Sequence, residues 1–176
     1  KRVLLIDMDF RQPSLHRLFG LPDSGNGIGE VMYEELDLKG SINSTPVEGV
    51  DLLPCGWHAR SSAPISYSRK FSGLISDLQQ EHAYDHILID TAPYGIISDA
   101  GPLIGLADGV ILTARFGVTI QAQFEHTMED LRRIHAPLAG SVLTAYDQEK
   151  SSDSYSWKGY CRYASKQYNK YLAPST

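Results

Sequence analysis

Short apolar runs recur along this chain, and each has the length of a buried strand. Such runs occupy residues 3–6, 50–53, 87–89 and 110–113, and a more polar one lies at 141–144. Continuous apolar runs, rather than strict alternation with polar residues, are typical of parallel strands that are covered on both faces. The runs therefore predict the strands of a buried parallel sheet.

Helical patterns separate these runs. Apolar residues between positions 71 and 78 follow the i, i+3, i+4, i+7 spacing of one amphipathic helix face, and a similar pattern covers 124–131. We expect two shorter helices, one within residues 12–19 and one at 28–33, while the rest of 20–49 forms mostly loop. Strands that alternate with helices predict an α/β fold with a parallel sheet and right-handed crossovers.

The charge of the chain is unevenly distributed. The 176 residues carry a formal net charge of -5, which argues against a general nucleic-acid binder. Residues 150–176 carry +4, so residues 1–149 carry -9. The same C-terminal stretch holds five of the ten tyrosines, namely Tyr155, Tyr160, Tyr163, Tyr168 and Tyr171. We predict one domain over residues 1–149 and a flexible tyrosine-rich tail over 150–176.

Cysteine content and hydropathy bear on the cellular compartment. Two cysteines are too few for a disulfide framework, so a reducing cytoplasm is the default expectation. The sequence shows no signal peptide, and no apolar run approaches the roughly 18 residues needed to cross a bilayer. We therefore expect a cytoplasmic domain.

Two of the expected strands end in carboxylates. Asp7 and Asp9 follow the first run two residues apart, and Asp90 follows the run at 87–89. Ligands of parallel α/β sheets bind outside the carboxyl ends of the strands, and hard oxygen ligands suit Mg²⁺ that is shared with phosphates. The alternative is that each acid caps the helix that follows its strand. Taken together, the two acidic strand ends favour a nucleotide–Mg²⁺ site.

Several motifs resemble those of the bacterial tyrosine kinases, the autokinases of capsule and exopolysaccharide loci. Residues 3–11 (VLLIDMDFR) look like the family's second Walker motif, apolar-D-x-D-x-R, and residues 90–93 (DTAP) look like its Walker B strand. Residues 50–56, 107–110 and 115–119 resemble further elements of the family, in the same order, and a tyrosine cluster closes the chain as in those kinases. The resemblance implies a P-loop NTPase-like fold of the deviant Walker type.

The family's first Walker motif, a glycine-rich loop that ends in Gly-Lys-Ser/Thr, is absent. None of the fifteen glycines is followed by lysine. Backbone amides and a lysine normally hold the β- and γ-phosphates in that loop. We therefore expect the first strand, the loop and the first helix to lie upstream of Lys1. The fold is then incomplete at its N-terminus, and the fragment alone is expected to be inactive.

The resemblance implies ATP and Mg²⁺ as cofactors and assigns roles to the acidic residues. Asp7 and, through water, Asp90 would hold the Mg²⁺, and Asp7 or Asp9 would accept the phenolic proton of a substrate tyrosine. Arg11 would contact phosphate or dock the substrate tail, and a surface salt bridge with Asp9 is an equally open alternative. Catalysis of this kind depends mainly on positioning and electrostatics.

The resemblance also implies further contacts and partners. Thr91 and Arg115 would bind the nucleotide. The tail tyrosines would be the phosphoacceptors, presented in trans by a neighbouring copy in a homo-oligomer. A membrane chain-length regulator, fused or separate, would be a second partner and would place the domain at the inner face of the plasma membrane.

Two other interpretations stay open. One is a deviant-Walker ATPase of the kind that positions septa or partitions plasmids, which shares the fold and the Walker B acid. The other is a non-catalytic scaffold of the polysaccharide machinery that has lost nucleotide binding. The tyrosine cluster and the D-x-D-x-R motif favour the kinase over both.

Overall fold

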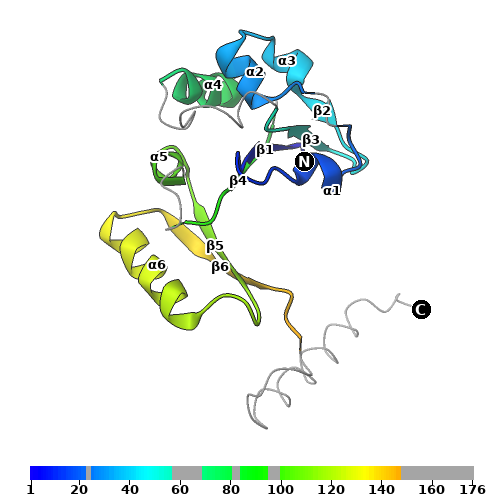
Figure 1. Cartoon of the computed structure of the whole chain (residues 1–176). Coiled ribbons are helices and arrows are strands. Elements are labelled where there is room, and N and C mark those ends of the chain that lie inside the picture. Colours follow the sequence, from blue (N-terminus) through cyan, green and yellow to red (C-terminus); the bar gives the residue numbers. More distant parts are fainter. Residues whose placement is uncertain (23–24, 57–68, 81–83, 95–99, 148–176) are drawn as a thin grey trace, which may run out of the picture.

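The computed structural model describes residues 1–22, 25–56, 69–80, 84–94 and 100–147. Within these residues the chain alternates between strands and helices, as the sequence predicts for an α/β fold. Figure 1 shows two groups of elements, one built around β1 and the other around β5 and β6.

The first sheet has four strands in the order β2-β3-β1-β4. Strand β1 (Val3–Met8) lies between β3 (Val50–Leu53) and β4 (His86–Thr91) and pairs with both in parallel. This confirms the predicted parallel arrangement for these three strands. The short strand β2 (Asn43–Ser44), in the stretch expected to be mostly loop, pairs antiparallel with β3.

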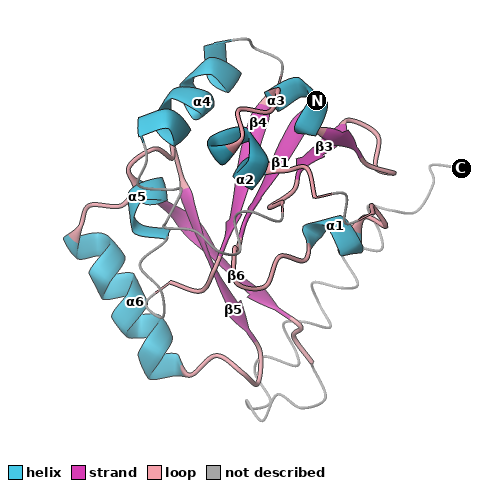
Figure 2. Cartoon of the chain, turned by 45° about the horizontal axis from the view of Figure 1, so that its top comes forward, coloured by secondary structure: helices cyan, strands magenta, loops and turns pink. Residues whose placement is uncertain are grey.

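The second sheet contains β5 (Val110–Arg115) and β6 (Leu138–Thr144), which pair in parallel. Among the described residues β4 ends the first sheet, and β5 pairs only with β6. The single sheet that the sequence predicts is thus divided between β4 and β5. Figure 2 shows the strands of the two groups crossing one another in projection.

Helices cover these sheets through the apolar faces that the sequence predicts. In α4 (Arg69–Gln80) the buried residues are Phe71, Leu74, Ile75 and Leu78, which are the four positions of the predicted face. They share one core with Leu4 and Ile6 of β1 and with Ile28 of α2 (Ile28–Tyr33). Figures 1 and 2 show α2 and α4 close together beside the first sheet.

The remaining helices are short, with one exception. Helix α1 (Leu15–Leu18) falls inside the predicted range, whereas α3 (Leu38–Ser41) lies in the stretch expected to be mostly loop. Helix α5 (Gly101–Ile104) was not predicted. Helix α6 (Gln121–Arg133) confirms the helix predicted around 124–131 and lies beside β5 and β6 (Figure 1). No helix in the described part of the chain is both long enough and apolar enough to cross a bilayer.

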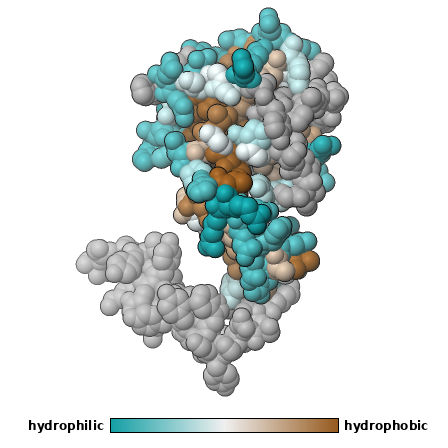
Figure 3. Space-filling view, turned by 90° about the vertical axis from the view of Figure 1, so that its left-hand side faces the viewer, coloured by the Kyte–Doolittle hydropathy of each residue, from teal (hydrophilic) through white to brown (hydrophobic). Residues whose placement is uncertain are grey.

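Apolar side chains remain exposed where the sheet is divided. Leu88 of β4 is 51% exposed and Ile111 of β5 is 59% exposed. Strands of parallel sheets are normally buried on both faces, so this exposure is unusual for such apolar strands. The space-filling view from the side of α5 and α6 also shows apolar surface open to solvent (Figure 3).

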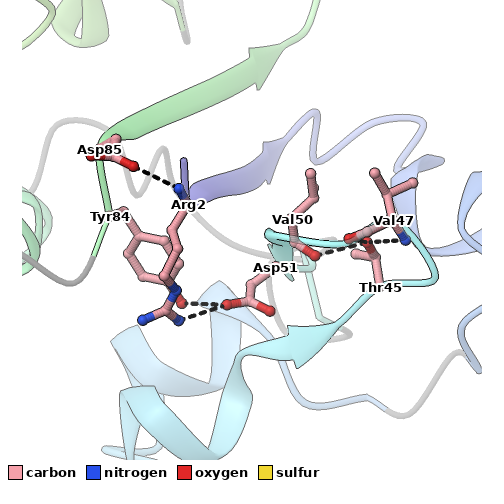
Figure 4. A network of polar contacts seen from close by, with 7 residues as sticks. All are labelled: Arg2, Thr45, Val47, Val50, Asp51, Tyr84 and Asp85. Carbon is pink, nitrogen blue, oxygen red and sulfur yellow. Dashed lines mark hydrogen bonds and ion pairs between the residues drawn. The ribbon is translucent and has the colours of Figure 1, made fainter.

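The amino-terminal ends of β1, β3 and β4 are joined by the amino-edge cluster, which consists of Arg2, Asp51, Tyr84 and Asp85 (Figure 4). The Arg2 Nη2 atom lies 3.1 Å from Oδ2 of Asp51, and the guanidinium carbon lies 4.9 Å from the centroid of the Tyr84 ring. The Tyr84 hydroxyl donates to Asp51 at 3.1 Å, and the Arg2 N–H donates to Asp85 at 2.6 Å. Burial first, and then Asp51, raises the pKa of Tyr84. The cluster therefore fastens three strands at the edge opposite their carboxyl ends.

Candidate functional site

The predicted acidic residues meet at the carboxyl edge of the first sheet. Asp7 and Asp90 occupy the same level of the parallel pair β1–β4, where each is the register partner of the other. Asp9 is the first residue after the end of β1. Parallel strands present their carboxyl ends at one edge of a sheet, which explains how two acids far apart in the sequence become neighbours.

Asp7 is fully buried, and both of its carboxylate oxygens accept backbone hydrogen bonds. Oδ1 accepts from the N–H of Asp9 at 3.2 Å, and Oδ2 accepts from the N–H groups of Ser14 and Leu15, each at 3.1 Å. The carboxylate thus holds the loop between β1 and α1 and satisfies amides at the start of that helix. This is the capping role that the sequence left open as an alternative, and it does not exclude a role in binding a cation.

The pKa of Asp7 is raised above its ordinary value. Burial is the largest cause, and the negative charge of Asp9 adds to it, while the three amide hydrogen bonds lower the pKa in part. Ionised Asp7 is therefore held in surroundings that disfavour its charge, and a bound cation would relieve this.

The pKa of Asp90 is raised as well. The largest cause is desolvation of its carboxyl group, although the residue as a whole is exposed, and the charges of Asp7 and Asp9 follow. The N–H of Thr91 lowers the pKa in part. Thr91 is half-buried and lies opposite Met8 at the end of β4, next to this acidic pair.

Asp9 and Arg11 lie in the turn that follows β1. Oδ1 of Asp9 accepts from the N–H groups of Arg11 at 3.1 Å and Gln12 at 3.0 Å. Arg11 is exposed and contacts Asp9 through its backbone. The roles of Arg11 in phosphate contact or in docking the tail stay predictions.

The acidic residues fit a magnesium ion that has few protein ligands. Among the described residues, no group of three or more His, Cys, Asp or Glu side chains is arranged to hold a metal ion. Mg²⁺ commonly keeps several waters and binds proteins through one or two carboxylates together with substrate phosphates. Asp7 and Asp90 match that requirement, and their role as Mg²⁺ ligands stays a prediction.

These pKa shifts predict an unusual dependence of stability on pH. Because the folded state holds protons on Asp7 and Asp90 more tightly than the unfolded state does, the free energy of unfolding should fall as pH rises from about 3.8, the ordinary value, through the raised pKa values. Asp90→Asn should flatten this fall, because the side chain at position 90 then no longer titrates, and the raised pKa that desolvation chiefly gives Asp90 is lost with it. Urea unfolding at a series of pH values would measure it.

The control for this prediction is Asp77→Asn, which removes an exposed acid on α4 that lies outside the pair. Its pH profile should follow that of the unsubstituted protein. If Asp90→Asn and Asp77→Asn gave the same profile, the raised pKa of Asp90 would not contribute to the pH dependence.

Other predicted residues lie elsewhere. Arg115 is exposed at the end of β5, in the second sheet, and its N–H donates to Oγ1 of Thr119 at 2.9 Å. The structure therefore does not place Arg115 on the strands that carry the acids. The tail over 150–176, with all five predicted phosphoacceptor tyrosines, lies outside the described residues.

The contacts that hold the loop after β3 were not predicted from the sequence. Glu30 is only 3% exposed and accepts the N–H of Gly27 at 2.9 Å, while the N–H of Ile28 donates to the carbonyl of Pro54 at 2.8 Å. These contacts fix the loop that follows β3 at the same carboxyl edge. Glu three residues after the N-cap Gly27 supplies the second half of a capping-box pattern, and this spacing could have revealed the contact.

Comparison with known proteins identifies relatives of this chain. No family model matches the sequence. The tyrosine-protein kinase ptk of Acinetobacter johnsonii is 30% identical over 156 residues, which are 88% of this chain but only 20% of that protein. The chain thus spans about a fifth of the length of this relative.

Solved structures agree with the sequence comparison. The VpsO kinase domain superposes with a TM-score of 0.75 at 28% identity, over 83% of this chain and 71% of that structure. The septum site-determining protein MinD of Pyrococcus horikoshii, solved with Mg-ADP, has a TM-score of 0.68 at 23% identity, over 89% of this chain and 63% of that structure, a likeness of fold. By sequence and by fold, this chain is a relative of the bacterial tyrosine kinases and has a P-loop NTPase-like fold.

Proposed function

We propose that this chain forms part of a protein-tyrosine autokinase that regulates the synthesis and export of capsule or exopolysaccharide. The observation that carries the proposal is the pairing of Asp7 with Asp90 at the carboxyl edge of the sheet, in a relative of tyrosine kinases. Two carboxylates with raised pKa values at this edge provide a site for a cation that accompanies a nucleotide.

The acidic residues have two different proposed roles, cation binding and proton acceptance. Asp7 and Asp90 would hold Mg²⁺, which neutralises phosphate charge when it is bound. Asp9 is less buried than Asp7, whose two oxygens already accept three amide hydrogens, so Asp9 is better placed to accept a proton from a substrate. In the transfer, the tyrosine hydroxyl would give its proton to this carboxylate while its oxygen bonds to the γ-phosphorus of ATP, and the bond to the β-phosphate oxygen would break to release ADP.

The phosphate-binding loop would come from sequence upstream of Lys1. A strand inserted between β4 and β5 would join the two sheets, and the helix that follows this strand would be available to cover Leu88 and Ile111, which are now exposed. A loop that follows such a strand would emerge at the same edge as Asp7 and Asp90, where its amides could hold the phosphates. The divided sheet therefore supports the expected location of this loop.

The charge distribution supports the tail as substrate. Residues 150–176 carry +4 and residues 1–149 carry -9, so the tail of one copy would be attracted to the acidic domain of another. Each phosphate adds about -1.5 to -2 charges and would weaken this attraction. From these charges we expect an oligomer that exchanges its tails before phosphorylation and dissociates after it.

A membrane chain-length regulator, fused or separate, is the second partner we propose, at the inner face of the plasma membrane.

The test uses the full-length protein with ATP and Mg²⁺, followed by mapping of phosphotyrosine by mass spectrometry. We expect label on the tail tyrosines, and a loss of about a hundredfold or more in Asp7→Asn, because a charge that binds the cation is removed. Asp77→Asn, on the exposed side of α4, should keep its activity.

Other outcomes would contradict the proposal. Absence of tail label, or label that Asp7→Asn leaves unchanged, would count against the kinase. ATP hydrolysis without phosphotyrosine would favour the positioning ATPase, and a failure to bind any nucleotide would favour the scaffold.

A further inference from the structure

The outer strand of the second sheet has an open edge. Among the described residues β6 pairs with β5 alone, and six of its seven residues are exposed. The strand that we propose between β4 and β5 would lie on the other side of β5 and would leave this edge free. An open edge presents unpaired backbone N–H and C=O groups, which can pair with a strand of another chain.

The open edge of β6 lacks the features that normally protect such an edge. Native proteins shorten their edge strands or place charged residues or proline on them. The outer strand of the first sheet follows this rule, because β2 has only two residues. Strand β6 has seven residues, none of them charged and none proline, and its Val142 and Leu143 are 48% and 53% exposed. The contrast indicates that β6 has a partner strand.

The hydrogen bonding to β5 shows which backbone groups face this edge. The N–H of Phe116 donates to the carbonyl of Thr144 at 2.9 Å, so the backbone groups of Thr144 face β5. Successive residues of a strand direct their backbone groups to alternate edges. Those of Val142 therefore face β5 as well, whereas Ser141 and Leu143 direct theirs to the open edge.

We propose that β6 pairs antiparallel with β6 of a second copy of this chain, so that one sheet continues across a two-fold dimer. A two-fold axis presents the same residues of both copies to one another. With the axis at Val142, Ser141 of each copy lies opposite Leu143 of the other, and these residues exchange backbone hydrogen bonds. The interface therefore uses the backbone groups that face the open edge.

The charges of the chain support a second copy as the partner. Residues 1–149 carry -9, so two copies repel one another wherever acidic surfaces meet. Pairing through β6 brings together two strands that carry no charge, and the apolar side chain of Val142 meets its own copy. Like charges directly opposite one another, which destabilise a strand pair, are thereby avoided.

The test is a disulfide between the two copies. In this register the Cα atoms of the two Val142 residues form a non-hydrogen-bonded pair about 4.5 Å apart. A disulfide spans that separation, so Val142→Cys should cross-link under mild oxidation. The full-length protein would be used without ATP and with Cys161→Ser, which removes a competing thiol, and mass spectrometry would identify the linked peptides.

Val118→Cys is the control for random collision. Val118 is 68% exposed, more than Val142, but it lies in the turn after β5 and not on the open edge. We expect Val142→Cys to give about tenfold more of the symmetric cross-link than Val118→Cys does, because only position 142 is held against its own copy.

Further variants, each added to Val142→Cys, test the open edge itself. Ser141→Pro removes the N–H that faces this edge and leaves the bonds between β6 and β5 in place, so the cross-link should fall about tenfold. Ser141→Ala keeps the N–H and should leave the cross-link unchanged. Leu143→Lys puts a charge on the same edge without changing the backbone and should also lower the cross-link.

Several outcomes would overturn the pairing. They are the absence of a cross-link in Val142→Cys, equal yields from Val142→Cys and Val118→Cys, and a cross-link that Ser141→Pro and Leu143→Lys both leave unchanged. With Cys161 retained, a disulfide from position 142 to Cys161 in place of the symmetric one would show that the tail covers this edge, and the inference would fail. None of these results depends on nucleotide binding, so they leave the test of the proposed function separate.

Discussion

Replacing Gly56 with alanine is expected to lower the free energy of unfolding by about 3 kcal/mol. Gly56 has a φ of +82°, in the left-handed region where a side chain is strained. A Cβ atom at this position would also overlap the carboxylate of Glu30. Glu30 is buried and hydrogen-bonded to Gly27, so it has little freedom to move away. Urea unfolding followed by circular dichroism would measure the effect.

Gly73→Ala is the matched control for this substitution. Gly73 lies inside α4, and a Cβ atom there would meet nothing within 4 Å. Alanine should therefore stabilise the protein by about 0.5–1 kcal/mol, since it favours the helix. Equal urea midpoints for the two alanine variants would show that the backbone conformation and close contact at Gly56 carry no cost.

Replacing Asp7 with alanine is expected to lower the free energy of unfolding by about 2 kcal/mol. Three backbone N–H groups, from Asp9, Ser14 and Leu15, would lose the carboxylate that accepts them. The loss is offset in part, because a buried charge with a raised pKa is removed at the same time. Thermal or urea unfolding at neutral pH would show the net effect.

Asp9→Ala is the control, because the half-buried Asp9 also accepts two backbone N–H groups, but through hydrogen bonds that are exposed to solvent. Water can replace the acceptor there, so the expected loss is below about 1 kcal/mol. If Asp9→Ala destabilised the protein more than Asp7→Ala did, burial of the amide hydrogen bonds would not be the source of the effect.

Much of the fold could be predicted because its strands consist of continuous apolar runs and its longer helices carry an apolar face. The apolar run at 50–53 and the helix at 28–33 match β3 and α2 in their bounds. The elements that escaped prediction are short or polar. Strand β2 (Asn43–Ser44) consists of two polar residues and exists because it pairs with β3, a tertiary contact that no local pattern encodes.

The candidate site, like the fold, could be predicted only in part. The acidic residues at strand ends were found because strand direction alone brings Asp7 and Asp90 to one edge. The sequence could not say that the loop after β1 would bury Asp7 completely, since this depends on how that loop turns towards α1.

The two edges of the first sheet differ in what their polar side chains do. At the amino edge, Arg2 joins β1 to Asp51 of β3 and to Tyr84 and Asp85 ahead of β4, so some of the contacts that hold the three strands lie away from the carboxyl edge. A lineage could therefore alter those carboxyl-edge residues that, unlike Asp7 and Glu30, do not hold the loops, and change chemistry or lose it while the scaffold survives. Active kinases and inactive descendants could then share one architecture, and mutations that change activity need not be the ones that unfold the protein.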